Sequence, residues 1–282
     1  MTRFMHTLIS ITRFPYAATT IDFGNMVAGA FGSDVTLLTV RATQASPGAG
    51  SAALTEAREH LPDPPANHVI RRGNAEAEIL AELRTEKYDL LVIGAREHRG
   101  SAGELLLGDV THRVVNQTPI SALVVRGSVP TLKNILVCTG GPSAPRSTVT
   151  TAAKLARATG SSATLLHVAD AVPSMYTGLT QLGETLPDLL QTDTPTARHL
   201  RDCAALMRAH QVEAHLELRH GMPANEILRA IERGHFDLLM IGASAHKGFD
   251  RLLLDEVSLK LVDDSPLPVL VVRSGLETVL AQ

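Results

Sequence analysis

The sequence predicts an α/β fold built from two tandem, doubly wound parallel sheets of five strands each. Two observations carry this prediction. The order of motifs in the first half of the 282-residue chain returns in the second half. Within each half, short apolar runs alternate with helical segments, a pattern that indicates βαβ units around a parallel sheet.

The duplication is visible in three pairs of segments that occur in the same order. The spacing between matched residues grows from 128 to 148 along the chain, so the second half carries an insertion, which we place near residues 170–195. Turn residues at 127–131 separate the halves and predict domains at 1–128 and 129–282. The matched segments are 32–40 with 160–168, 73–100 with 221–248, and 119–126 with 266–273.

The insertion at 170–195 is rich in Pro, Gly and Thr and predicts a long loop with a helical turn or two. It could cover the second-half site as a lid, contact the other half, or form a mobile surface loop.

The elements of the first half follow from the same patterns. Residues 89–95, DLLVIGA, are apolar almost throughout, which is typical of a parallel strand covered on both faces. Apolar residues at 75, 79, 80 and 83 form one face of a helix. The expected order is strand 6–11, helix 16–31, strand 34–40, helix 51–61, strand 67–72, helix 74–87, strand 89–95, helix 104–117 and strand 121–126.

Composition narrows the classes of function. Hydrophobic residues make up 44% of the chain and charged residues 20%, which predicts a packed core. A net charge of −3 and only 3% aromatic residues argue against a nucleic-acid surface. No apolar run is long enough for a membrane span or a signal peptide, so we expect a cytoplasmic protein. Cys138 and Cys203 have no CxxC spacing and are expected to be buried free thiols.

The repeated motifs resemble the universal stress protein family across nearly the whole chain. Each half has DLL(V/M)IGA, a His-(Arg/Lys)-Gly loop, an (E/R)LLL segment and a terminal strand ending in LVVR. The resemblance implies a five-stranded α/β sandwich of the adenine nucleotide alpha hydrolase type that dimerises, often through its last strand. We therefore expect 119–126 and 266–273 to pair antiparallel within the chain as a pseudo-dimer, because unpaired edges invite pairing. A further homodimer stays open.

Many members of this family bind ATP through Gly-x2-Gly-x9-Gly-(Ser/Thr), in which glycines and a hydroxyl hold phosphates at a helix start. An Asp after the first strand contacts the nucleoside. The first half departs from this pattern, because Glu97 replaces the second glycine and the third glycine comes one residue late, at Gly108. Asp109 follows where a hydroxyl is expected, and its carboxylate repels phosphate. Arg13 stands near the family's Asp.

The second half departs further. Ala245 replaces the second glycine, and Gly140 stands in place of the nucleoside Asp. Asp255 and Glu256 replace the closing Gly-Ser pair and suit a helix start without any ligand. If a site survives in the first half, it is lined by Thr12, Arg13, Val40, Gly94, Arg96, His98, Arg99, Gly100, Gly108 and Asp109. The second-half equivalents are Thr139, Gly140, Gly242, His246 and Lys247.

No constellation in the sequence predicts a catalytic residue, since no G-x-S-x-G elbow is present. His98 and His246 occupy matching positions and could bind a metal or sense pH, but inherited exposed histidines are the simpler interpretation. His215 and His220 fall on opposite faces of a strand, which disfavours a three-histidine zinc site with His210.

We therefore expect a stress-response protein without robust ATP binding that acts through protein or small-ligand contacts. Binding of ATP or another adenine nucleotide, or slow ATP hydrolysis, in the first half is the alternative. Contacts with nucleic acid or membrane are not expected.

Overall fold

The computed structural model confirms the α/β prediction. The first half contains β1 His6–Ile11, α1 Ala17–Ala30, β2 Asp34–Arg41, α2 Ala49–His60, β3 Asn67–Arg72, α3 Ala75–Thr85, β4 Leu90–Gly94, β5 His98–Arg99, β6 Leu105–Leu106, α4 Asp109–Gln117 and β7 Ser121–Val125. The second half contains β8 Asn134–Cys138, α5 Ser147–Thr159, β9 Ser162–Ala169, α6 Leu186–Gln191, α7 Pro195–Ala209, β10 Ala214–His220, α8 Pro223–Arg233, β11 Leu238–Gly242, α9 Glu256–Asp264 and β12 Val269–Val272. The structure describes residues 5–12, 17–44, 49–61, 67–85, 88–95, 98–99, 105–106, 108–142, 144–169, 185–243, 253–276 and 280.

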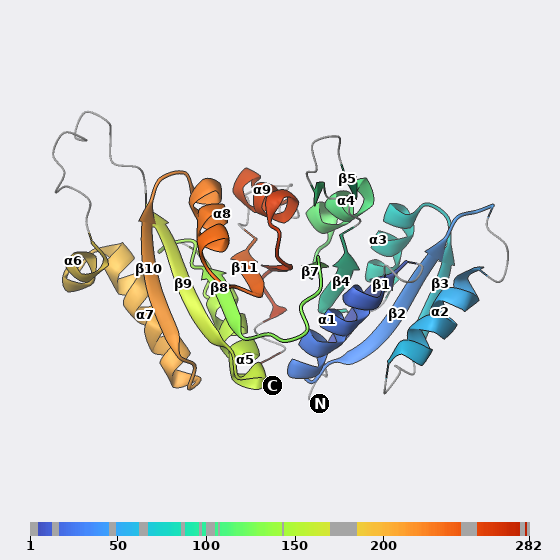
Figure 1. Cartoon of the computed structure of the whole chain (residues 1–282), viewed down its shortest axis with the longest axis horizontal. Coiled ribbons are helices and arrows are strands. Elements are labelled where there is room, and N and C mark those ends of the chain that lie inside the picture. Colours follow the sequence, from blue (N-terminus) through green and yellow to red (C-terminus); the bar gives the residue numbers. More distant parts are fainter. Residues whose placement is uncertain are drawn as a thin grey trace.

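Both halves contribute to one ten-stranded sheet, in the order β10-β9-β8-β11-β12-β7-β4-β1-β2-β3. Neighbouring strands are parallel within each half, and the junction between β7 and β12 is antiparallel. In its register Leu270 lies opposite Leu123, and Val269 opposite Val124. The predicted pairing of the two last strands is therefore confirmed, and Figure 1 shows the two halves side by side.

Helices cover both faces of this sheet, and each face has a core that continues from one half into the other. The first core cluster joins α1 and α2 to α5 and α7, and the second joins α3 and α4 to α8 and α9. The central strands are fully buried, with Leu91, Leu123 and Leu270 at 0% exposure. Apolar side chains on both faces of each central strand explain why these strands read as continuous hydrophobic runs.

A buried arginine from the first half holds a helix of the second half. Arg126, directly after β7, is 5% exposed. Its guanidinium donates to the carbonyl oxygens of Asp263 at 2.8 Å, Ser265 at 2.9 Å and Val262 at 2.5 Å. These carbonyls lie at the end of α9, where the helix leaves acceptors unsatisfied and the helix dipole favours a cation.

Arg273, directly after β12 in the second half, makes the equivalent contact with a helix of the first half. Its Nη2 lies 3.5 Å from the carbonyl oxygens of Val115 and Asn116 at the end of α4, and its backbone N–H donates to Ser121 Oγ at 3.0 Å. Burial lowers the pKa of Arg273. Each half thus places one arginine at the end of the partner half's helix, close to the α4 and α9 pair at the top centre of Figure 1.

One expected element differs from the structure, and one is confirmed in part. The helix predicted at 104–117 is wrong at its start, because α4 begins at Asp109 and Leu105–Leu106 instead pair antiparallel with His98–Arg99. Gly108 has an extended backbone, with φ −67° and ψ 140°, so the helix does not extend through it. Within the predicted insertion, α6 is the expected helical turn and packs Leu189 against α7, whereas 170–184 lie outside the described residues.

Cys138 and Cys203 are both free, as predicted; Cys203 is buried and Cys138 is half-buried. In the part of the chain that the structure describes, no helix combines the length and apolar character needed to cross a bilayer.

Replacing Arg126 with Met should lower the free energy of unfolding by about 3 kcal/mol, because three carbonyl oxygens at the end of α9 lose a charged donor. Urea denaturation followed by circular dichroism measures this loss. Arg113→Met is the matched control, since the Arg113 side chain is 59% exposed beside Glu76. It should change stability by no more than about 0.5 kcal/mol. Equal losses in both variants would contradict the role given to Arg126.

Candidate functional site

The candidate site of the first half lies at the carboxyl ends of β1, β2 and β4, where open α/β sheets bind ligands. Ile11 lies opposite Thr39 and Ser10 opposite Ile93 in the strand register. Thr12, Val40 and Gly94 follow at the same edge. The structure therefore brings these three predicted residues together on neighbouring strands, with Thr12 exposed and Val40 half-buried.

The start of α4 joins this edge. Thr111, in the first turn of α4, donates its hydroxyl to the carbonyl oxygen of Gly94 at 3.0 Å. Gly108 is the buried N-cap residue, and Asp109 is the exposed first residue of the helix. No side chain among the described residues caps this helix. Its first amides therefore have no side-chain acceptor there.

The matching helix start in the second half is closed by the protein itself. Asp255 is the N-cap of α9, and its Oδ1 accepts a hydrogen bond from Ser258 N at 2.7 Å. The carboxylate thus already accepts a hydrogen bond from an amide that would face a bound phosphate. Its negative charge also complements the helix dipole. Thr139 and Gly140 follow β8 and Gly242 ends β11, so these three lie at the equivalent edge of the second half.

The glycines that end β4 and β11 have a packing role of their own. A Cβ at Gly94 would collide with the Thr20 hydroxyl of α1. A Cβ at Gly242 would lie 2.7 Å from the Thr148 hydroxyl of α5. A helix therefore crosses each strand end so closely that a side chain does not fit. This close packing explains both glycines without any bound ligand. Thr20 and Thr148 occupy matching positions in the two halves, and this match was the signal in the sequence that could have indicated the contact.

Part of the predicted loop cannot be placed. Arg13, Arg96, Gly100, His246 and Lys247 lie outside the described residues. His98 and Arg99 are described through their backbone in β5, without their side chains. Their roles as ligand-binding residues stay predictions.

Sequence reasoning missed a group of side chains around Thr139. His167 Nδ1 lies 3.4 Å from Thr139 Oγ1, and His199 Nε2 lies 3.3 Å from the Thr139 carbonyl oxygen. Cys203 Sγ is 3.6 Å from His199 Nε2. Burial raises the pKa of Cys203 to about 11, so this thiol is protonated at neutral pH and is a poor nucleophile. The spacing of four between His199 and Cys203 on a helix was the available signal.

Among the described residues, no group of three or more His, Cys, Asp or Glu side chains is arranged to hold a metal ion.

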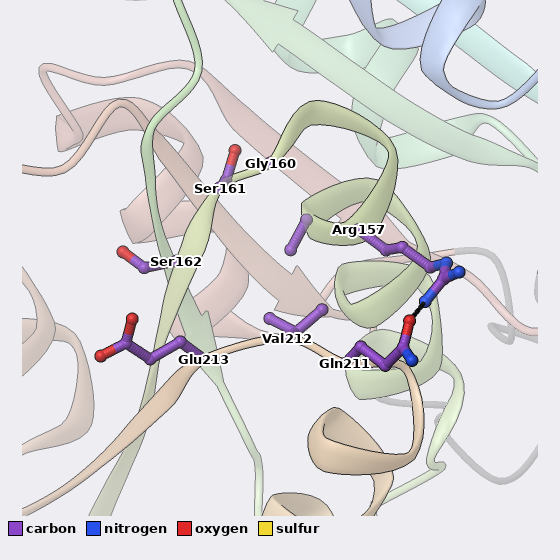
Figure 2. A pocket seen from close by; sticks show the side chains of 8 residues that line it. Arg157, Gly160, Ser161, Ser162, Gln211, Val212 and Glu213 are labelled. Carbon is purple, nitrogen blue, oxygen red and sulfur yellow. Dashed lines mark hydrogen bonds between the residues drawn. The ribbon is translucent and has the colours of Figure 1, made fainter.

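A pocket of about 480 Å³ lies at the opposite edge of the sheet, before β9 and β10 begin (Figure 2). Arg157 spans one side of it and donates to the Gln211 side chain and to the His210 carbonyl oxygen. This pocket is separate from the carboxyl edge that carries the candidate site. Its lining residues are Ala156, Arg157, Gly160, Ser161, Ser162, Gln211, Val212 and Glu213.

Comparison with known proteins settles the family. The sequence profile of the universal stress protein family matches residues 4–126 and 131–273. The chain belongs to the universal stress protein family. A universal stress protein of Methanocaldococcus jannaschii is 27% identical over 152 residues, which cover 53% of this chain and 87% of that relative.

Solved structures with the same tandem arrangement share this fold. A putative universal stress protein from Pseudomonas aeruginosa UCBPP-PA14 superposes with a TM-score of 0.70 at 15% identity, covering 100% of this chain and 99% of that one. A universal stress protein from Archaeoglobus fulgidus gives 0.66 at 15% identity, covering 96% and 98%. The ten-stranded sheet is thus the tandem universal stress protein fold.

The packing role of Gly94 predicts a specific double-mutant result in this universal stress protein. Gly94→Ala should destabilise the chain by about 1–3 kcal/mol through overpacking against Thr20. Adding Thr20→Ala should recover most of that loss, because it removes the colliding hydroxyl. Thermal or urea unfolding of the two single variants and the double variant measures the coupling.

The pair Gly242→Ala and Thr148→Ala repeats the test in the second half and should show the same loss and the same recovery. A Gly94→Ala variant of unchanged stability, or one that Thr20→Ala does not rescue, would refute the packing explanation.

Proposed function

We propose that this universal stress protein is a stress-response binding protein without robust ATP binding, which acts through protein or small-ligand contacts. It carries out no catalysis in this proposal. The cytoplasmic location, the domain limits 1–128 and 129–282, and further pairing as a homodimer stay predictions.

The capping of α9 by Asp255 is the observation that carries the proposal. A phosphate at a helix N-terminus needs free backbone amides and a positive local potential. In the second half, the Asp255 carboxylate already accepts from Ser258 N at 2.7 Å and adds a negative charge, with Glu256 next to it. A bound phosphate would have to displace this carboxylate from its amide. This cost supports a second half that does not bind the phosphates of a nucleotide.

A second candidate function is weak binding of an adenine nucleotide in the first half, with slow ATP hydrolysis as its enzymatic extension. The uncapped start of α4 favours it, because no described side chain occupies those amides. Asp109 opposes it, since an exposed carboxylate in the first turn repels the phosphates of a nucleotide. Because one feature favours nucleotide binding and the other opposes it, nucleotide binding is best tested in the first half.

Calorimetric titration of the full chain with Mg-ATP tests the proposal. The wild-type chain should bind no tighter than about 1 mM. Asp109→Ser should strengthen binding about tenfold, because it removes a charge next to the phosphates and supplies a hydroxyl. The control is Glu213→Gln, which removes a 79% exposed carboxylate at the opposite edge of the sheet and should leave the titration unchanged.

Micromolar binding of Mg-ATP by the wild-type chain would overturn the proposal that this protein lacks robust ATP binding. If a further variant, Asp255→Ser, abolished that binding, the second half would be the site of it, and the inference that this half binds no phosphate would be wrong as well.

A further inference from the structure

Two histidines from different elements hold one residue at the carboxyl edge of the second half. His167, near the end of β9, is 8% exposed, and its Nδ1 lies 3.4 Å from Thr139 Oγ1. His199, in the first half of α7, is half-buried, and its Nε2 lies 3.3 Å from the Thr139 carbonyl oxygen. A carbonyl oxygen only accepts, so His199 donates its Nε2 proton there. Thr139 therefore connects β8, β9 and α7.

A third imidazole stands on the same face of the sheet. His167 lies opposite Leu218 in the register of β9 and β10, and His220 follows two residues later. Residues two apart on a strand point to the same face, so His220 shares the face of His167. Leu218 packs there against the cluster formed with α6 and α7.

In the part of the chain that the structure describes, the other charged or titratable groups beside these histidines come from α5 and α7. Arg146, the N-cap of α5, pairs with Asp202 of α7 at 2.5 Å. This pair neutralises itself. Cys203 of α7 lies 3.6 Å from His199 Nε2 and carries no charge, because burial raises its pKa to about 11. Among the described residues that face the two histidines, no further carboxylate is left to balance a positive charge on them.

We propose that His167, His199 and Thr139 form an acid-responsive latch, which holds α7 on β8 and β9 at neutral pH and loosens α7 when the two imidazoles become protonated. We call these three residues the histidine latch. The proposal does not depend on nucleotide binding in either half. It gives the second half a regulatory role as a sensor of acid.

The direction of the pH effect follows from the surroundings of each ring. Burial lowers the pKa of His167, and His199 and His220 lower it further. Burial also lowers the pKa of His199, as does Arg146, against the opposing effects of the Thr139 carbonyl and Asp202. In the unfolded chain both rings titrate near pH 6.5, at about the ordinary value.

The folded chain therefore binds these protons more weakly than the unfolded chain. Above about pH 6.5 the two imidazoles are neutral in both the folded and the unfolded chain, so their titration does not change the free energy of unfolding. As the pH falls below that value, the unfolded state gains protons first and stability decreases, until the folded pKa values are passed. Local opening of α7 relieves the same penalty without global unfolding.

Hydrogen exchange of the full chain, corrected for intrinsic rates, tests the latch at about pH 7.5 and about pH 5. The test variant is His167→Asn with His199→Gln, because Asn and Gln keep hydrogen-bonding groups near Nδ1 and Nε2 without the titration. In the wild type, protection of the α7 amides should fall about tenfold further on acidification than in this double variant. The control variant is His210→Asn, at the C-cap of α7 and outside the latch, which should behave as wild type.

Helix α3 of the first half is the internal reference, and its protection should change equally in all three proteins. Equal acid responses of α7 in the wild type and the double variant would overturn the proposal. If the double variant does not fold, His199→Gln alone should show a reduced acid response of α7, and a wild-type response would equally refute the latch.

Discussion

The antiparallel pairing of β7 with β12 removes the apolar sheet edge that each half would otherwise expose. Both strands are fully buried, and their side chains join the two cores that run through the molecule on either side of the sheet. Arg126 and Arg273 reinforce the pairing because each one reaches the end of a helix in the opposite half. The two halves therefore share one sheet, two cores and a reciprocal pair of helix contacts.

This shared interior leaves the carboxyl edges of the two halves free to diverge. The features needed for packing are kept in both, as Gly94 under Thr20 and Gly242 under Thr148 show. The start of α4 has no side-chain cap from the described residues, whereas α9 is capped by Asp255. In the second half, His167 and His199 lie beside Thr139 at the carboxyl edge of the sheet, where open α/β sheets bind ligands. Duplication thus preserved the scaffold and changed the chemistry at its edge.

Sequence patterns predicted the strands and the junction well because both depend on local signals. Residues 90–93 are apolar because both faces of the strand are covered, and the two terminal strands are apolar because they pair with each other at the junction. The start of α4 was misplaced, since apolar residues at 105–106 resemble a helix until the extended backbone of Gly108 separates them. Arg126 was visible only as part of a repeated LVVR motif.

The contacts that individual polar side chains make could not be predicted from the sequence. Glu82 lies on the buried side of α3 because Arg71 and Tyr88 bond to its carboxylate, at 2.6 and 2.9 Å. The meeting of His199 with Thr139 likewise depends on how α7 packs, and no spacing in the sequence encodes it. Of the candidate site, the strand-end positions were predictable, whereas the partner of each side chain was not.

We infer that the junction makes the two halves one cooperative unit. Native-state hydrogen exchange of the β7 and β12 amides, followed with increasing denaturant, measures this most directly. We predict that amides buried in β1 and β4, in β8 and β11, and at the junction exchange with the same free energy, equal to that of global unfolding. Exchange of one half at a lower free energy, while the other half stays protected, would contradict the account.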